Sequence, residues 1–279
     1  MPLSRRSLLR LGSFIPPLAL LGTLKPAQSP AAAVSAATVT DGFPGHSPEM
    51  IRETVLVAHF NEKRLRELVD AHPSLSRAAW DWGFGDWEDA LGAASHMGNR
   101  SIAELLISKG ARPSLFSAAM LGELDVVKSF LAAHPGAHRI FGPHSISLLA
   151  HARMGGPAAR PVLDFLQSLG EVESPPAALT PEDISILVGT YPFGSSPSQQ
   201  LEIDANARIY AGNKMYTYAP QLNFTRKGTM PRPLFHLGDR VFYPAGAPAV
   251  RIRFSMEGSA TTITVSDPGP ILTARRSTS

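Results

Sequence analysis

The sequence predicts an α+β protein of several domains, in which paired helices are followed by a small antiparallel β-domain. A helix–glycine–helix pattern recurs between residues 51 and 171, which indicates a solenoid of helical pairs. Beyond residue 181, apolar and polar side chains alternate between frequent turn residues, as in half-buried strands. A separate apolar leader precedes both regions.

The leader carries paired arginines, Arg5 and Arg6, followed by the apolar run Leu11–Leu24 and the small-residue stretch Ala31–Ala37. This arrangement resembles a twin-arginine export signal, which implies cleavage near residue 36 and a periplasmic or secreted protein. The apolar run is shorter than the roughly 20 residues that span a bilayer. We therefore expect no membrane span in the mature chain.

Charge and cysteine content narrow the possible functions. Four of the 26 Lys and Arg residues lie in the leader, where no acidic residue occurs, so 22 remain against 23 Asp and Glu. A chain with this balance has no excess positive charge for nucleic acid, and we expect no nucleic-acid partner. The chain has no cysteine, which excludes disulfides, thiolate metal sites and a cysteine nucleophile.

The repeating unit is a helix of small residues, a glycine and an amphipathic helix. Its copies cover Leu56–Val69, Leu91–Leu106, Leu115–Phe130 and Leu148–Leu166. The glycine is expected to take the positive φ of the turn, while the small residues let neighbouring units pack closely. The pattern resembles the ankyrin repeat over residues 51–171, with about four helical pairs, although its threonine-proline opening is missing.

The ankyrin resemblance implies a concave surface that binds other proteins. His96, Met120 and Arg153 each lie two residues before the glycine of their unit. The shared register predicts that these three side chains line that surface and contact a protein partner.

Residues 80–89 hold all three tryptophans, Trp80, Trp82 and Trp87, together with Asp86 and other carboxylates. Three interpretations are open. The aromatic side chains fill a gap between the first two repeats, they form an exposed binding site for a partner, or the carboxylates are catalytic. The flanking residues favour packing for Trp87 and exposure for Trp82.

The last hundred residues predict a small antiparallel β-barrel or sandwich of seven or eight strands. Thr180-Pro181 begins a short helix, and a strand follows around residues 188–191. Val250, Ile252, Phe254 and Met256 are expected on the buried face of a later strand. Together with the regions above, the predicted segments are a leader at 1–36, linkers at 37–50 and 172–180, the repeats at 51–171 and the β-domain at 181–279.

Short strings in this region resemble the β-domain appended to penicillin-binding-type serine hydrolases. They are Leu187–Tyr191, Gly238–Pro244 and Thr273–Arg276. The hydrolase itself needs a serine three residues before a lysine, and no lysine of this chain has one. The resemblance therefore implies an accessory module without catalytic residues.

No motif for a nucleophile, a phosphate loop or a dinucleotide is present. His134, His138 and His144 are the nearest approach to a metal motif, but Pro135-Gly136 opposes helical geometry between the first two. The sequence therefore predicts no catalytic residue, metal or cofactor.

The function predicted from the sequence is an exported, non-catalytic binding protein whose solenoid docks a protein, such as a co-exported enzyme. The alternative is a hydrolase or carbohydrate-active protein that uses residues 80–89. A deep cleft walled by Trp80, Trp82 and Asp86 would favour this alternative.

Overall fold

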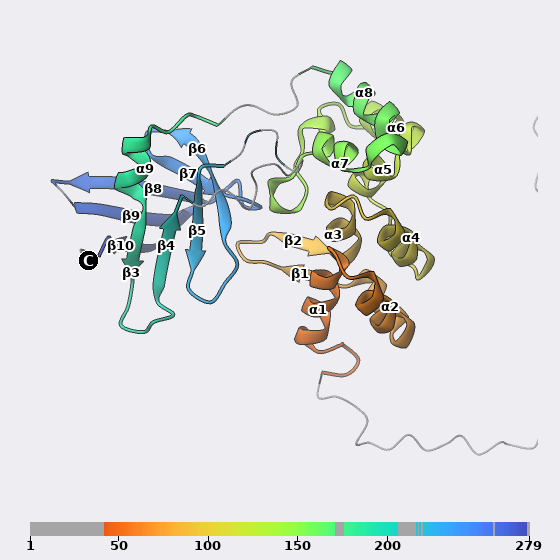
Figure 1. Ribbon diagram of the computed structural model, residues 1–279, viewed down its shortest axis with the longest axis horizontal. Helices are drawn as coiled ribbons and strands as arrows, with labels where there is room; N and C mark the ends of the chain where they lie inside the picture. The colour runs from red at the N-terminus through yellow and green to blue at the C-terminus, as the bar shows by residue number, and fades with distance from the viewer. Residues whose placement is uncertain are drawn as a thin grey trace, which may run out of the picture. The chain divides into compact units, whose positions relative to one another are not determined.

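The computed structural model describes residues 42–170, 176–205, 216, 218, 220–258 and 260–277. The predicted export signal lies outside these residues. Residues Pro44–Ser279 form one compact unit, which contains all the elements below (Figure 1). Among the described residues, no helix combines the length and the hydropathy needed to cross a bilayer.

The predicted helical pairs are confirmed. They are α1 Pro48–Ala58 with α2 Glu62–Ala71, α3 Ala90–His96 with α4 Arg100–Ser108, α5 Leu115–Leu121 with α6 Leu124–Ala133, and α7 Leu148–Met154 with α8 Arg160–Ser168. The first helices of the pairs contact one another in the order α1, α3, α5 and α7. Their alanines and other small residues are buried, which permits this close stacking.

Glycine ends the first helix of two pairs as the sequence predicts, with φ of 72° at Gly98 and 81° at Gly122. Gly155 departs from the prediction because its φ is −67°, a conformation open to any residue. Its lack of a side chain serves another purpose, since a Cβ there would collide with the backbone carbonyl of Met120. The glycine at this position therefore permits close approach of two helices.

Residues 79–89 form a hairpin of β1 Ala79–Asp81 and β2 Trp87–Asp89, in which Trp80 pairs with Glu88. The turn between the strands uses positive φ at three successive residues from Gly83 to Gly85. The hairpin extends from α1 and α3 toward the large sheet (Figure 1).

The C-terminal region is one antiparallel sheet of eight strands. These are β3 Gly189–Pro192, β4 Gln200–Asp204, β5 Leu222–Arg226, β6 Arg232–Gly238, β7 Val241–Pro244, β8 Arg251–Glu257, β9 Ala260–Asp267 and β10 Gly269–Arg275. They pair in sequence order from β3 to β10. The Ser277 N–H donates to the Thr190 carbonyl at 2.8 Å, which brings the two edges together into a nearly closed barrel.

Most local predictions for this region are confirmed, but Met256 is 36% exposed and not on the buried face, because it lies at the end of β8 beside the following turn. Helix α9 (Pro181–Leu187) begins at Thr180, whose hydroxyl accepts the Asp183 N–H at 3.1 Å. Val250, Ile252 and Phe254 are buried in the barrel core, while Arg251 points outward between them.

Hydrogen bonds between described residues connect the helical region to the region that contains the sheet. The Arg232 guanidinium on β6 donates to the Gly83 carbonyl at the hairpin turn, at 3.0 Å. The Gly246 N–H donates to the Ser145 hydroxyl at 2.8 Å, and the Tyr216 hydroxyl donates to the His144 carbonyl at 2.8 Å. These contacts hold the hairpin and the loop before α7 against the sheet.

Candidate functional site

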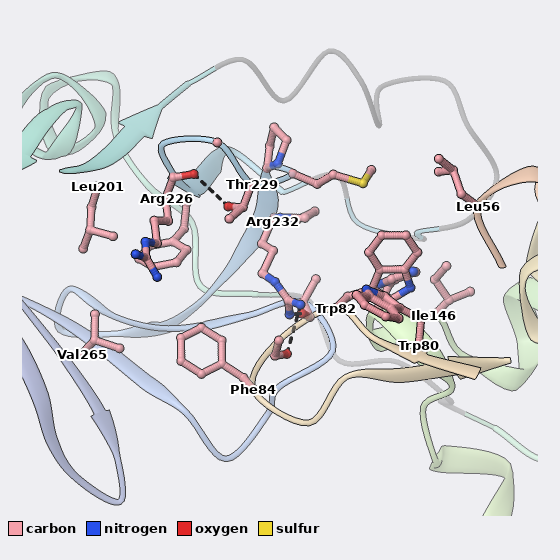
Figure 2. A pocket seen from close by; sticks show the side chains of 18 of the residues that line it. Leu56, Trp80, Trp82, Phe84, Ile146, Leu201, Arg226, Thr229, Arg232 and Val265 are labelled. Carbon is pink, nitrogen blue, oxygen red and sulfur yellow. Dashed lines mark hydrogen bonds between the residues drawn. The ribbon is translucent and has the colours of Figure 1, made fainter. Parts of the chain in front are cut away.

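A cavity of about 980 Å³ lies where α1, α3, the hairpin and the sheet meet (Figure 2). Its lining includes Arg52, Leu56, His59, Trp80, Trp82, Phe84, His96, His144, Ile146, Phe193, Leu201, Tyr216, Phe224, Arg226, Arg232 and Val265. Most of these side chains are aromatic or aliphatic, as in sites for small molecules.

The charged side chains on the cavity wall are all basic. Arg52, Arg226 and Arg232 lie over the rings of Trp82, Phe193 and Phe84, at 5.6, 5.9 and 5.9 Å from the ring centroids. The described residues that line the cavity include no Asp or Glu. The cavity therefore combines an apolar interior with positive charge.

Glu88 lies behind this wall, and its side chain is completely buried. The Trp82 indole N–H donates to its Oε2 at 2.8 Å. Three imidazoles surround the carboxylate, with His59 Nε2 at 3.5 Å and His144 Nε2 at 3.3 Å from Oε2, and His96 Nδ1 at 3.2 Å from Oε1. We call His59, Glu88, His96 and His144 the Glu88 cluster.

The helices position the first two imidazoles of the Glu88 cluster. His59 follows the last residue of α1, and its Nδ1–H donates to the carbonyls of Val55 and Leu56 at 3.0 and 3.1 Å. His96 is the last residue of α3 and is buried. Alternation along β2 turns Glu88 inward.

Asp86 holds the third imidazole in position. Its carboxylate accepts the His144 backbone N–H at 3.0 Å and the His144 ring Nδ1–H at 2.8 Å. Arg232 lies 3.5 Å from the same carboxylate, so the buried negative charge has two cationic neighbours. His144 itself takes the left-handed conformation, with φ of 58°.

Burial and charge act in opposite directions on these groups. Burial alone would lower the pKa of His144, but the neighbouring Asp86 and Glu88 carboxylates outweigh it and raise the pKa to about 9. Burial would raise the pKa of Asp86, yet its contacts with His144 lower it overall. Burial among other imidazoles holds the pKa of His96 well below its usual range.

Polar atoms at the centre of this site lack hydrogen bonds. Glu88 Oε1 and His96 Nδ1 are both buried and face each other, yet neither makes a hydrogen bond among the described residues. One ligand atom each from His59, Glu88 and His96 lies within 4.8 Å of the others. Such an arrangement can transfer protons to a bound molecule or coordinate a metal ion.

The structure brings together only some of the residues that the sequence singled out. Trp80 and Trp82 line the cavity, Asp86 is buried beside it, and His96 belongs to the Glu88 cluster. Trp87 is 63% exposed, whereas Trp82 is half-buried, so the predicted roles of these two tryptophans were reversed.

Two other predicted contacts do not reach the site. Met120 is completely buried in the core between helices, which corrects the prediction that it lines an open binding surface. Arg153 is half-buried on α7 and does not line the cavity. Residues at equivalent positions of the repeats therefore have different surroundings, because the elements packed against each helical pair differ.

His59 and Glu88 were not singled out from the sequence, and His144 was considered only beside His134 and His138, as a metal motif that helix geometry opposes. A signal for the first was available, since His59 and His96 both lie at the C-terminal end of the first helix of a pair. Glu88 lies two residues after Asp86, on the same face of the hairpin strand. His144 had no such signal, because a loop brings it to Asp86 across 58 residues.

No protein-family model matches the chain, and a search of curated proteins finds no similar sequence. The cavity and the Glu88 cluster therefore carry the functional argument.

Proposed function

We propose that this protein binds a small organic anion with a large apolar part, and holds it in the cavity beside the Glu88 cluster. The observation that carries the proposal is the combination of an aromatic cavity, three arginines on its wall and the absence of acidic side chains among the described lining residues. Like the hydrolase or carbohydrate-active alternative predicted from the sequence, this proposal places the site at residues 80–89, but its ligand is an organic anion.

The size and chemistry of the cavity support this ligand class. A volume of about 980 Å³ lies at the upper end of the range for sites that enclose a drug-sized molecule. Arg52 and Arg226 are exposed at the cavity and can pair with a carboxylate or phosphate. Their stacking on Trp82 and Phe193 holds the cations beside apolar surface.

Calorimetric titration with decanoate and with 1-decanol tests the proposal, because the two probes share an alkyl chain and differ in charge. We expect decanoate to bind with one-to-one stoichiometry and at least about tenfold more tightly than the alcohol, since a charge-assisted hydrogen bond contributes about 1.5 to 3 kcal/mol. Equal affinity for the two probes would contradict the anion preference.

Variants of the exposed arginines locate the binding site. Arg52→Gln and Arg226→Gln should each weaken decanoate binding by about tenfold. Arg251→Gln is the matched control, because Arg251 is also exposed, does not line the cavity, and donates to the Pro248 and Val250 carbonyls. Equal losses in all three variants would place the anion outside the cavity.

The finer features predicted from the sequence form part of the same proposal. The four helical pairs are ankyrin-like units, supported by the positive φ at Gly98 and Gly122. The sheet serves as a module like the one appended to penicillin-binding-type hydrolases, and it supplies one wall of the cavity.

Arg5 and Arg6 direct export, so replacing both with lysine should retain the protein in the cytoplasm.

A protein partner is the second candidate, favoured by the 63% exposure of Trp87 on the hairpin. Large exposed aromatic side chains are typical hot spots of protein interfaces. Cross-linking in periplasmic extract through a photoreactive residue at position 87 should capture one discrete partner. The same residue placed at the exposed position 164 on α8 is the control.

A further inference from the structure

We propose that His59, Glu88 and His96 bind a single divalent zinc-class metal ion. Imidazole nitrogen and carboxylate oxygen are the donors of the His₂Glu set that Zn²⁺ accepts. The inference does not depend on the organic anion, because it concerns only the atoms of these three side chains.

The hydrogen bonds of the cluster leave suitable lone pairs free. His59 uses its Nδ1–H on two backbone carbonyls, so the lone pair of its Nε2 faces Glu88. A ligating histidine commonly donates its second ring N–H in this way, which fixes the ring and its tautomer. His96 presents Nδ1 to the same carboxylate.

The distances within the cluster match the edges of a coordination polyhedron. Two ligands held at about 2.0 to 2.1 Å from a tetrahedral Zn²⁺ lie about 3.3 Å apart, and in an octahedral site about 3.0 Å apart. His96 Nδ1 and His59 Nε2 lie 3.2 and 3.5 Å from the nearer Glu88 oxygens. The two distances end on different oxygens of the Glu88 carboxylate, and the three ligand atoms lie close enough together to reach one metal ion.

Two buried atoms have no other role among the described residues. Glu88 Oε1 and His96 Nδ1 are inaccessible to solvent and make no hydrogen bond, although they lie 3.2 Å apart. Leaving such buried groups without partners destabilises the folded state. A metal ion between them would satisfy both.

The surroundings supply the contacts that usually support a metal centre. Trp82 donates to Glu88 Oε2, and Asp86 fixes His144 beside the same oxygen. We assign His144 a positioning role, since its nitrogens do not group with the three ligands. His59 and His96 also line the cavity, so a metal ion held by them would lie beside a molecule bound there.

The test uses the purified full chain after treatment with a chelator. We expect one equivalent of Zn²⁺ to rebind, measured by plasma mass spectrometry after desalting. Co²⁺ in the same site should give the intense visible absorption of tetrahedral coordination without a sulfur charge-transfer band, because the chain has no cysteine.

Variants then assign the ligands. Glu88→Gln and His59→Gln should each lower Zn²⁺ affinity more than about 100-fold in competition with a chromophoric chelator, and His144→Gln about tenfold. His134→Gln is the matched control, because His134 lies outside the cluster against Phe130, and its affinity should remain within about twofold of wild type.

Circular dichroism checks that each variant folds. If Glu88→Gln does not fold, His59, whose side chain is partly exposed, provides the second variant. X-ray absorption of the Zn²⁺-loaded wild type requires no variant and should show two imidazoles and oxygen around the metal. Failure of the wild type to retain Zn²⁺, a zinc shell without imidazole, or unchanged affinity in both Glu88→Gln and His59→Gln would overturn the assignment.

Discussion

Asp86 and His144 form two hydrogen bonds with each other, one from the backbone N–H at 3.0 Å and one from the ring Nδ1–H at 2.8 Å. Through this pair the hairpin holds the loop that precedes α7, across 58 residues of sequence. The carboxylate is buried, so its negative charge depends on His144 and on Arg232, 3.5 Å away.

We predict that Asp86→Asn lowers the free energy of unfolding by about 3 kcal/mol, because removing one member of a buried charged group leaves the others unpaired. Urea denaturation at pH 7 measures this change. Asp164→Asn is the control, since Asp164 pairs with Arg160 on the exposed face of α8 and should cost less than about 0.5 kcal/mol. Similar losses of unfolding free energy in both variants would show that the buried Asp86–His144 contact contributes no more stability than an exposed ion pair.

Trp82 and Trp87 offer a second matched comparison. Trp82→Phe retains an aromatic ring but removes the N–H that donates to buried Glu88 Oε2, so we expect a loss of about 1 to 3 kcal/mol. Trp87→Phe changes an exposed side chain and should stay within about 0.5 kcal/mol of wild type. Chemical denaturation measures the free energy of unfolding of both variants. A larger loss for Trp87→Phe than for Trp82→Phe would contradict the arrangement of the hairpin.

Gly155 and Gly156 are adjacent but are required for different reasons. A Cβ at Gly155 would meet the Met120 carbonyl, whereas Gly156 has φ of 65° and open space around it. We therefore expect Gly155→Ala to cost more than about 2 kcal/mol, because a close helix contact must open. Gly156→Ala should cost about 1 kcal/mol from backbone strain alone. Thermal denaturation measures both losses of stability. A larger loss for Gly156→Ala than for Gly155→Ala would show that α5 and α7 have room to separate.

Local pattern predicted much of the fold. The recurring glycine marked the helical pairs, and the alternation around Ile252 marked a strand of the barrel. These features depend on residues close together in the chain, so the sequence records them directly. The single nearly closed sheet, in place of a sandwich, depends on contact between its first and last strands.

The site was less predictable because it depends on contacts far apart in sequence. Asp86 and His96 were identified as candidates, but their partners His59 and His144 come from other elements. Met120 shares its repeat position with His96 and is nevertheless a core residue. Repeat register identifies equivalent backbone positions, while the neighbouring elements decide which of them reach a cavity.

We expect a small anion to bind at the hairpin, and tryptophan fluorescence measures this binding most directly. The chain has three tryptophans, so Trp87→Phe leaves only Trp80 and Trp82, which both line the cavity. Titration of this variant with decanoate should give a saturable change in its fluorescence emission. The midpoint of that change should agree with the affinity measured by calorimetry. Decanoate binding by calorimetry without any change in that emission would place the ligand elsewhere and contradict the proposed site.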